Sequence, residues 1–599
     1  MRDSPGLENQ NTLAQDRVGH DSSDAANAVL GFNNEWRRFG PMGRDITGYV
    51  PRFPDAPTVR WPTELVTGAP YLPDERRRKS GKNKLQWDYT FVTNVARTFK
   101  SSRDRPDLCV HATFTTERDA IELIKHCTAN GMPLVFDDFP DSLRWASAAD
   151  SFEDDPFMDP QRWSTDPVHG VVGANLKTPR EFHDAAIREV KPLRPYVIAT
   201  LLDFRTWLKM PGKIRCILDL TCGFRQRDDI TNRIADNMVE SSSQSYGNQY
   251  SGHFGIVADM LRTHEWFLLH TAGFLTFGHI DASGMATSAQ IRGAGLKEWF
   301  IFKASKMPRP RTGDTRAERL RVQKLLVKRV VDLIRAASTD TLEPPASDGG
   351  EEEDAWSVDG CVIELRPGMK YYQPAGTVHG AFTPVPTAAA GMHFFTYDDL
   401  HRMEVSRRVQ QHKNGVTNHN HNCGVQLMLI TMAAALPMRA AAGQTFRRKP
   451  MIALALMLTR PYEYIPKPDE LNDIPATDRR TADEDKVLQA EKENAERRDE
   501  YNLTVRLRSA RWADSGTAFD RLAHAVAMRI LLACKTKYPG DARAELPGPE
   551  YILEGDRWDD PGPTLDVMSI TDDLTTTHVD DIVQEESEEG SDSDLTDLD

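Results

Sequence analysis

Cysteine is scarce in this chain, and long apolar runs are missing. Its 599 residues include 7 cysteines, none in a C-x-x-C pair, which argues against a disulfide framework or a structural zinc site. The apolar stretch 425–436 is too short to span a bilayer, and Pro437 and Arg439 follow it closely. Residues 1–30 are polar and lack the apolar run of a secretory signal. We therefore expect a reduced, intracellular protein with no membrane association.

Basic residues are missing from the end of the chain. The segment 571–599 holds twelve acidic residues and no Lys or Arg, so it carries −12 of the net charge of −15 and leaves −3 for the rest. This composition is typical of a disordered, solvating tail, and a tail that binds basic partners such as histones is the alternative. The chain as a whole, 39% hydrophobic and 8% aromatic, is long enough for a large core and two or more folded units.

Two motifs far apart in the sequence indicate a metal site. The first is a glycine, five residues and then His279-x-Asp281; the second has the form G-x5-P-x-G-x2-H and runs from Gly368 to His379. A lone His-x-Asp is weak, because another copy stands at 578–580 in the acidic tail with no strand around it. The second motif is more specific, since its glycines and proline are turn residues that bracket a short extended run before the histidine.

The three metal-ligand candidates have the residue types of an iron site. Side chains alternate along a strand, so His279 and Asp281 are expected on one face, and His379 from a separate strand can complete the set. Two imidazoles and one carboxylate on one side of an ion leave three positions open, a pattern that suits non-heme Fe(II) oxygenases.

These residues carry a family resemblance. Over residues 106–400 the chain resembles the JmjC group of the cupin superfamily, the 2-oxoglutarate-dependent dioxygenases that include protein hydroxylases and histone demethylases. Asn130–Phe136 resembles the strand that opens the family's domain, and Gly391–Phe395 resembles the strand after the last ligand. The resemblance implies a mainly β core with α-helices, built as a double-stranded β-helix (jelly-roll or cupin) barrel with flanking helices, with His279, Asp281 and His379 as ligands of Fe(II).

The resemblance also implies a site for 2-oxoglutarate. Lys297 opens a hydrophobic strand eighteen positions after the first ligand, where many JmjC members keep a lysine for the distal carboxylate; a solvated lysine at a strand end is the alternative. Thr276 matches a T-x-x-H pattern that supplies a hydroxyl in some relatives. Strict alternation points Thr276 away from the metal unless the strand bulges there.

The remaining chain divides by composition. Capping boxes predict helices at Thr116–Asn130 and from Thr178 through Ile187, and a basic amphipathic helix is expected at 316–337, followed by an acidic linker over 343–354. Helical patterns return after residue 400, at 427–436, 452–458 and 518–534. The expected organisation is a disordered N-terminus (1–30), an N-terminal extension (31–105), a barrel domain (106–400) with an insertion at about 303–358, a C-terminal helical region (401–540) and an acidic disordered tail (541–599).

Charge and histidine clusters allow two interpretations each. The basic helix 316–337 is either a solvated face or a contact for nucleic acid or chromatin. The basic cluster 76–79 is either a solvated loop or a nuclear import signal, which favours a nuclear over a cytoplasmic location. His412, His419 and His421 are better explained as a surface loop than as a metal site, because no further ligand stands at suitable spacing.

The sequence thus predicts an Fe(II)/2-oxoglutarate-dependent dioxygenase that hydroxylates or demethylates a protein, with histone as one candidate substrate. An adaptor for chromatin or nucleic acid with an inactive cupin barrel is the alternative, and a cupin metalloenzyme that does not use 2-oxoglutarate is a third. No chromatin-reading motif or methyl-lysine pocket is recognisable in the spacing, so the substrate stays open, as does the oligomeric state.

Overall fold

The computed structural model describes most of the central and C-terminal chain, namely residues 57–69, 86–140, 179–188, 195–207, 210, 213–221, 230–236, 265–292, 295–310, 315–345, 355–412, 422–464, 518–555, 557–572 and 574. The basic cluster 76–79, most of the acidic linker, the histidines at 419 and 421, and the predicted disordered segments 1–30 and 575–599 lie outside these residues.

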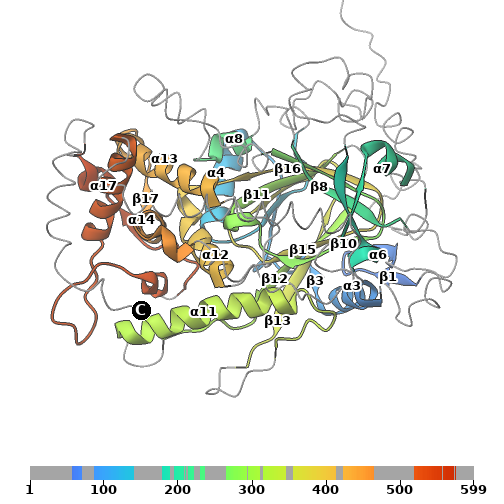
Figure 1. Ribbon diagram of the computed structural model, residues 1–599, viewed down its shortest axis with the longest axis horizontal. Coiled ribbons are helices and arrows are strands. Elements are labelled where there is room, and N and C mark those ends of the chain that lie inside the picture. Colours follow the sequence, from blue (N-terminus) through green and yellow to red (C-terminus); the bar gives the residue numbers. More distant parts are fainter. Residues whose placement is uncertain are drawn as a thin grey trace, which may run out of the picture.

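Two β-sheets form the centre of the molecule (Figure 1). The smaller sheet has the order β10 (Phe274–His279), β15 (His379–Thr383), β12 (Lys297–Ala304), β13 (Val358–Leu365) and β3 (Lys100–Ser101). The larger has the order β4 (Val110–Ala112), β5 (Leu134–Phe136), β14 (Lys370–Gln373), β11 (Ala286–Arg292), β16 (Thr387–Phe394), β9 (Glu265–His270), β8 (Arg215–Thr221), β6 (Arg180–Asp184) and β7 (Tyr196–Ala199). Neighbouring strands are antiparallel except for the pairs β3–β13 and β4–β5.

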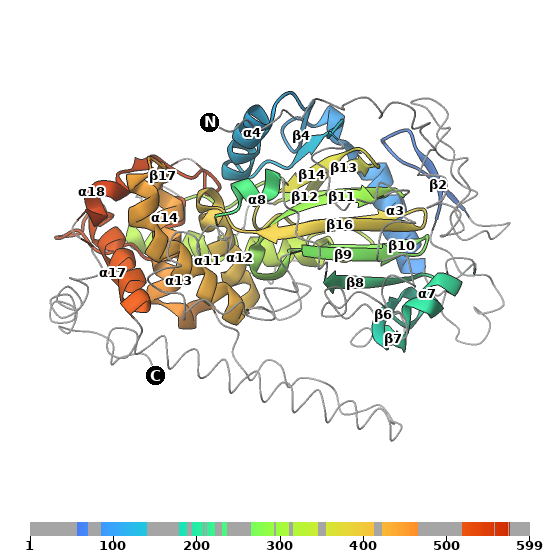
Figure 2. The same ribbon diagram turned by 90° about the horizontal axis from the view of Figure 1, so that it is seen from above.

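The two sheets face each other across a shared hydrophobic cluster. Trp299 and Ile363 of the small sheet meet Ile291 and Tyr371 of the large one in this cluster. The expected β-rich core with flanking helices is confirmed. The expected closed barrel is not seen among the described strands, because the two sheets remain separate layers and the large one continues outward through β8, β6 and β7 (Figure 2).

Strand β12 contains a continuous hydrophobic run because both of its faces are buried in hydrophobic clusters. Trp299 faces the other sheet, whereas Phe300 and Phe302 face outward into a second cluster. That cluster includes Trp61, beside the hairpin β1 (Thr58–Arg60) and β2 (Val66–Gly68), and Phe91 of α3 (Gln86–Thr98). A strand buried on both faces has no polar alternation. Because this extension also contributes β3 to the small sheet, the boundary expected at 106 falls inside the folded unit.

Of the two helices predicted from capping boxes one is correct and one is wrong, and the helix predicted from its amphipathic pattern is also correct. Thr116 caps α4 (Glu117–Ala129) and Thr315 caps α11 (Arg316–Ala336), each by accepting a hydrogen bond from a backbone N–H in the first turn. The helix expected from Thr178 through Ile187 is instead β6 followed by the short α6 (Ala185–Arg188). Pairing of β6 with β7 and β8 outweighs the local cap, and Asp184 caps the helix by accepting from two backbone N–H groups.

Two small helices and a further two-stranded sheet complete the description. They are α7 (Leu201–Trp207), α8 (Ile230–Ile234) and the antiparallel pair of β17 (Phe446–Arg447) with β18 (Thr564–Leu565). Helix α8 belongs to the hydrophobic cluster that also holds α4 and the outer face of the large sheet.

The described part of the chain after residue 400 is mainly helical, as predicted. It contains α12 (Leu400–His412), α13 (Asn422–Ala441), α14 (Arg448–Thr459) and α17 (Ala518–Ala533), which share one large hydrophobic cluster. The disordered tail expected from 541 is wrong for its first part. Residues up to Leu574 carry β18 and α18 (Val567–Thr571) and bury Tyr551 and Ile552 in the same cluster, so apolar side chains order this otherwise polar stretch.

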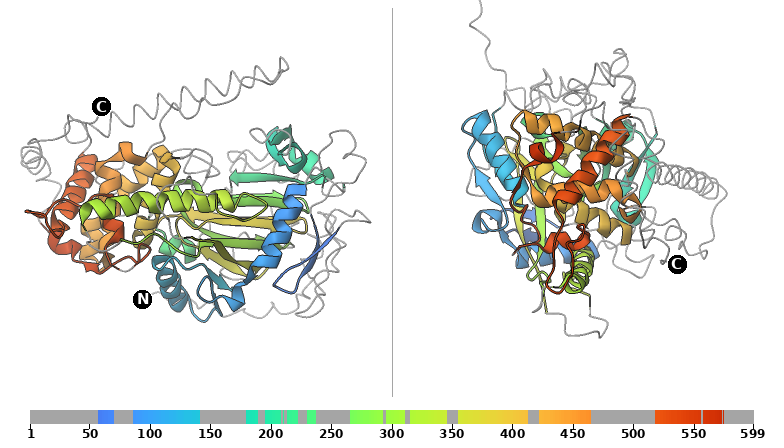
Figure 3. Two further views of the ribbon diagram at one scale, coloured as in Figure 1. Left: turned by 90° about the horizontal axis from the view of Figure 1, so that it is seen from below. Right: turned by 90° about the vertical axis from the view of Figure 1, so that its left-hand side faces the viewer.

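Helix α11 runs along both parts of the molecule (Figure 3). Its N-terminal half places Val322 and Leu326 in the C-terminal cluster, and its C-terminal half places Val330 and Ile334 against the small sheet. The expected insertion is therefore a packed bridge between the two parts. None of the described helices has the length and the apolar character needed to cross a bilayer.

Candidate metal centre

The three predicted ligands converge between the two sheets. One ligand atom from each of His279, Asp281 and His379 lies within 4.8 Å of the others, and this is the only such group of His, Cys, Asp and Glu among the residues that the structure describes. Oδ1 of Asp281 lies 3.9 Å from Nε2 of His279 and 3.7 Å from Nε2 of His379. Neighbouring ligands on an octahedral ion with bonds of about 2.1 Å are roughly 3 Å apart, so a small inward movement would place all three atoms on one ion.

The strand pairing that produces this convergence is visible in the register. β10 and β15 are antiparallel, and His279 lies directly opposite His379, with ring centroids 4.3 Å apart. Gly368 and Gly376 adopt positive φ angles of 95° and 66°, so the turn residues of the second motif bring β15 into place as predicted.

Backbone carbonyls fix how each imidazole presents its nitrogens. Nδ1 of His279 is 2.8 Å from the carbonyl oxygen of Phe277, and Nδ1 of His379 is 3.1 Å from that of Thr377. A carbonyl only accepts, so each Nδ1 must carry the proton, which leaves each Nε2 with a lone pair for a metal. The neutral, Nδ1-protonated tautomer is the one that this donor set requires.

Asp281 is held by hydrogen bonds to Oδ2, the carboxylate oxygen that is not directed at His279 and His379. Its Oδ2 accepts from the Thr287 hydroxyl at 2.5 Å and from Nε2 of Gln373 at 3.0 Å. The side-chain oxygen of Gln373 in turn accepts from the hydroxyl of Tyr371 and the indole of Trp299. Such partners orient a ligating carboxylate and leave Oδ1 directed at the imidazoles.

Electrostatics favour the charge states that bind a cation. Burial by itself raises the pKa of Asp281, but the neighbouring His379, His393 and His279 outweigh it and hold that pKa below its ordinary value. Burial lowers the pKa of His379 to about 4, so the ring is neutral near pH 7. His279 is the most exposed of the three candidate ligands, with 18% of its side chain accessible against 6% for Asp281 and 4% for His379.

Lys297 lies on the inner face of β12, two positions before Trp299, which stacks on His379. Its side chain is buried rather than solvated, and burial lowers its pKa to about 8. No hydrogen-bond or ion-pair partner for its ammonium group is found in the described part of the chain. The solvated strand-end alternative is thus wrong, and a buried cation of this kind calls for an anion.

Thr276 is brought to the inner face by an irregularity of β10. The register shifts between Thr276 and His279, so that Thr276 lies opposite Ala381 while His279 lies opposite His379. Three residues of β10 therefore span two of β15, the mark of a β-bulge, which reverses the alternation at this point. Residues directly opposite each other share a face, and Thr276 consequently lies on the side of Ala381 and of the metal ligands.

Two further buried polar atoms face the same interior from the large sheet. Nε1 of Trp266 and Nδ1 of His270 have no hydrogen-bond partner in the described structure. Their strand β9 pairs with β16, whose Ala389 and Gly391 leave little side chain between the sheets. Gly391 is required there, because a Cβ would lie 2.1 Å from the Trp266 ring. The interior beside the metal ligands thus offers hydrogen-bond donors and small side chains.

Three residues of the centre were not predicted. Thr287, Gln373 and His393 surround Asp281, with Nδ1 of His393 at 2.8 Å from the Thr287 hydroxyl and 3.9 Å from Oδ2 of Asp281. Gln373 could have been suspected, since it directly precedes Pro374 in the second motif. Thr287 and His393 are opposite each other on β11 and β16, a relation that only the strand register reveals.

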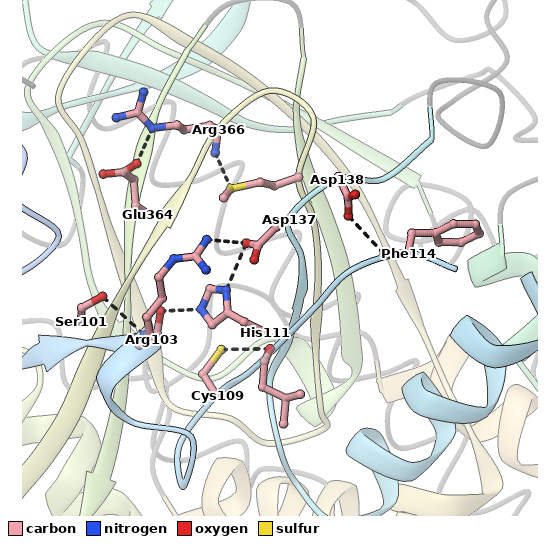
Figure 4. Close-up of polar contacts among 12 residues, drawn as sticks. Ser101, Arg103, Cys109, His111, Phe114, Asp137, Asp138, Glu364 and Arg366 are labelled. Carbon is pink, nitrogen blue, oxygen red and sulfur yellow. Dashed lines mark hydrogen bonds and ion pairs between the residues drawn. The ribbon is translucent and has the colours of Figure 1, made fainter. Parts of the chain in front are cut away.

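A second polar group resembles a catalytic triad in its hydrogen bonds, and Figure 4 shows its His111 and Asp137 together with Arg103. Oγ of Ser102 is 2.8 Å from Nε2 of His111, whose Nδ1 is 3.1 Å from Asp137, and Arg103 donates to the same carboxylate. A triad buries its carboxylate and exposes its serine. Here Ser102 is 2% exposed and the Asp137 side chain 28%, so we interpret the group as a structural network between β3, β4 and β5.

The basic helix is partly neutralised within the fold. Arg316 contacts Glu550, Arg321 contacts Glu318, and Arg335 contacts Asp332. Arg329 is 5% exposed, donates to the carbonyl oxygen of Lys306 and lies on the ring of Trp356. Much of the positive charge of α11, which could have formed a free cationic face, is therefore engaged in contacts within the protein.

Comparison with known proteins adds no relative: no family model matches the chain, and no curated protein matches it. The functional interpretation thus depends on the geometry described above.

Proposed function

We propose that this protein is a JmjC-like, Fe(II)/2-oxoglutarate-dependent dioxygenase that hydroxylates or demethylates a protein substrate. The observation that carries the proposal is the meeting of His279, Asp281 and His379 within 4.8 Å, with Nε2 of each ring and one carboxylate oxygen directed at a common point. A facial set of two histidines and one carboxylate leaves positions for a co-substrate and O2 on Fe(II).

The strand order supports a jelly-roll arrangement around this site. Of the consecutive strands β9 to β16, four lie in the small sheet (β10, β12, β13 and β15) and four in the large sheet (β9, β11, β14 and β16), so the chain passes from one layer to the other at every step except from β12 to β13. Eight strands divided in this way are typical of double-sheet jelly rolls, a group that includes the cupins. The ligands then lie between the layers, as the proposed class requires.

Lys297 supports 2-oxoglutarate as the co-substrate. In the proposal its buried ammonium group pairs with the distal carboxylate, and the hydroxyl of Thr276 lies on the same inner face between Lys297 and the ligands. The unpaired indole N–H of Trp266 is a donor for an oxygen-rich ligand in the same interior, and the unpaired Nδ1 of His270 adds further hydrogen-bonding capacity. A buried cation is stabilised by such an anion, and the anion is held in one orientation.

The chemistry follows from this arrangement. Bound iron would activate O2, so that 2-oxoglutarate, O2 and a substrate C–H bond give succinate, CO2 and a hydroxylated product. When the hydroxylated carbon is an N-methyl group, the product breaks down to formaldehyde and the demethylated amine. The chain itself supplies three oriented ligands, a cation for the co-substrate and an interior that excludes bulk water.

An anaerobic titration tests the proposal. Fe(II) and 2-oxoglutarate added to the intact protein should produce a weak visible charge-transfer band, and His279→Ala should abolish it. The matched control is His578→Ala, which removes the other His-x-Asp histidine and should leave the band unchanged. Absence of the band in the intact protein, or its persistence in His279→Ala, contradicts the proposal.

Lys297 separates this function from a cupin metalloenzyme that does not use 2-oxoglutarate. Lys297→Ala should weaken 2-oxoglutarate binding by at least about 30-fold, because loss of one partner of a buried charge pair costs about 2 kcal/mol or more. Lys297→Arg should restore part of the affinity, and metal binding should be unaffected in both. An unchanged affinity for 2-oxoglutarate in Lys297→Ala would favour the other metalloenzyme class.

The adaptor alternative has less support from the described residues. Its main feature was the basic helix, whose Arg316, Arg321 and Arg335 are engaged with carboxylates. An adaptor also has no need for three converging metal ligands. Salt-dependent DNA binding that survives His279→Ala, with no succinate formed over a panel of methylated histone peptides and cell-extract proteins, is the result that would favour it.

A further inference from the structure

The turns that carry the metal ligands are packed against the C-terminal helical region. One turn follows Asp281 and includes η5 (Ala282–Gly284); the other, residues 374–378, precedes His379. Met285 and Ala375, which belong to these turns, are members of the C-terminal hydrophobic cluster and not of the cluster between the sheets. The metal site is thus bounded on one side by the sheets and on the other by α12.

Ser406 of α12 occupies a slot between the two turns. A Cβ at Gly284 would lie 2.3 Å from the Cβ of Ser406, and a Cβ at Gly376 would lie 2.3 Å from its Oγ. Both glycines have positive φ angles, and the N–H of Gly376 donates to the carbonyl oxygen of Gly284 at 3.2 Å. The two turns therefore touch each other and both close on one serine side chain, which is 3% exposed.

Other residues of the same helix hold the second turn by its backbone. Oδ2 of Asp399 accepts from the N–H of Ala375 at 3.1 Å, and Nε of Arg402 donates to the carbonyl oxygen of Ala375 at 3.1 Å. Both backbone polar groups of Ala375 are thus satisfied, one by α12 and one by the residue just before it. The Ser406 hydroxyl donates to the carbonyl oxygen of Arg402 and so keeps its own rotamer.

In the first turn, the contact with α12 accompanies an unusual backbone conformation. Ser283, two residues after Asp281, has φ 55° and ψ 14° and is fully buried. A left-handed conformation is unfavourable for a non-glycine residue and persists only where the surroundings enforce it. The neighbouring Gly284 packs against Ser406 and lies near the backbone of Met403, so α12 is the element that encloses this turn.

We propose that Ser406 is a positioning residue for the metal centre, and that α12 couples the C-terminal helical region to metal affinity. The slot admits a serine or an alanine but nothing larger without separating the turns that hold Asp281 and His379. Because such coupling is reciprocal, metal binding should in turn stabilise α12. The inference uses the metal site of the proposed function but does not depend on its oxidative chemistry.

Substitutions at 406 test the inference with Co(II) as the probe metal. Ser406→Ala fits the slot and should keep Co(II) affinity within about threefold of the original protein, whereas Ser406→Leu should lower it by about 10- to 100-fold, the range seen when ligand orientation is lost. The visible Co(II) absorption of Ser406→Leu should also change in shape, which a loss of overall stability alone would not produce. Equal affinities and spectra for the two variants would overturn the inference.

Leu454→Ala is the matched control for stability. Leu454 is fully buried in α14 within the same C-terminal cluster and has no place in the two turns. This variant should lower the unfolding temperature while leaving Co(II) affinity unchanged. If Leu454→Ala reduces the affinity as much as Ser406→Leu does, general destabilisation explains both effects and the specific role of Ser406 is refuted.

Hydrogen exchange in the metal-free protein provides a readout that needs no metal. Peptides covering 281–285 and 374–379 should exchange faster in Ser406→Leu than in Ser406→Ala, and unchanged exchange would refute the slot. If the original protein binds Co(II) but gives no charge-transfer band with Fe(II) and 2-oxoglutarate, the proposed function fails while this comparison still decides the inference. Should Ser406→Leu not fold, Asp399→Asn and Asp399→Ala replace it: the amide keeps an acceptor for Ala375, so only the alanine variant should speed exchange at 374–379.

Discussion

At the scale of single residues, the geometry of the candidate metal centre depends on the hydrogen bonds that orient its side chains. The convergence of the three candidate ligands could be predicted because each has a residue type and a spacing tied to turns and strands. Their orientation could not, since it depends on Thr287 and Gln373, which reach Asp281 from strands whose register the sequence does not specify. The same limit applied to Thr276, whose face was decided by a one-residue bulge.

Thr287→Val tests the role of orientation. Valine keeps the shape and the strand preference of threonine but removes the hydroxyl that donates to Oδ2 of Asp281. We expect metal affinity to fall by about 10- to 100-fold, as for other partners of metal ligands. A chelator competition measures the change, with Thr287→Ser as the control that keeps the hydroxyl. Unchanged affinity in Thr287→Val would mean that Asp281 needs no such partner.

Gly391→Ala tests how tightly the interior is filled. The added Cβ would lie 2.1 Å from the Trp266 ring and 2.3 Å from the carbonyl oxygen of Ser288, so a strand or a ring must shift. Overpacking of this kind costs about 1–3 kcal/mol of unfolding free energy. Urea unfolding measures the loss, and a variant as stable as the original protein would show that the two sheets adapt there without cost.

At the scale of elements, α11 shows what a charge pattern predicts and what it leaves open. The helix itself was predicted nearly to its ends, because its amphipathic spacing is a local property of the sequence. Which of its cations are solvated depends on distant partners such as Glu550 and Trp356. For the same reason the capping box at Thr178 failed: strand partners far along the chain overrode it.

Two variants of α11 distinguish buried from exposed charge. Arg329→Ala should destabilise the protein by about 2–4 kcal/mol, because it removes a buried guanidinium, its hydrogen bond to Lys306 and its packing on Trp356. Lys324→Ala, on the exposed side of the same helix, should stay within about 0.5 kcal/mol. Thermal or urea unfolding gives both values. Similar losses in the two variants would refute the distinction.

At the scale of the whole molecule, the sandwich and the C-terminal helices are joined more closely than the composition suggested. The β-rich core and the helical end were both predicted, yet the boundaries at 106 and 541 were not real divisions, because β3 and the segment up to Leu574 pack across them. Composition reports where polar residues gather. It does not report which few apolar side chains, such as Tyr551 and Ile552, anchor a polar stretch.

The stability of the protein should depend on pH through His401, which lies where α12 contacts the C-terminal segment. Its ring is fully buried in α12, with Nε2 3.2 Å from the carbonyl oxygen of Asp559, and burial lowers its pKa to about 3. A base whose folded pKa lies below its ordinary 6.5 contributes full stability above pH 6.5 and loses it as pH falls toward 3. Between pH 7.5 and 5.0 that loss is about 2 kcal/mol.

His401→Gln removes this titration. The fall in unfolding free energy from pH 7.5 to 5.0, measured by urea unfolding, should be smaller in the variant by about 2 kcal/mol. Comparing each protein with itself at the two pH values cancels the cost of the substitution. An equal fall in both proteins would show that His401 is not kept neutral by the fold.

The central claim is that three side chains, distant in the sequence, hold one divalent ion between the two sheets. A crystal grown with Mn(II) or Co(II) and measured at the absorption edge of that metal tests this most directly. We predict a single strong anomalous peak bonded to Nε2 of His279, Nε2 of His379 and Oδ1 of Asp281. A peak elsewhere, or no peak at these three atoms, would contradict the account.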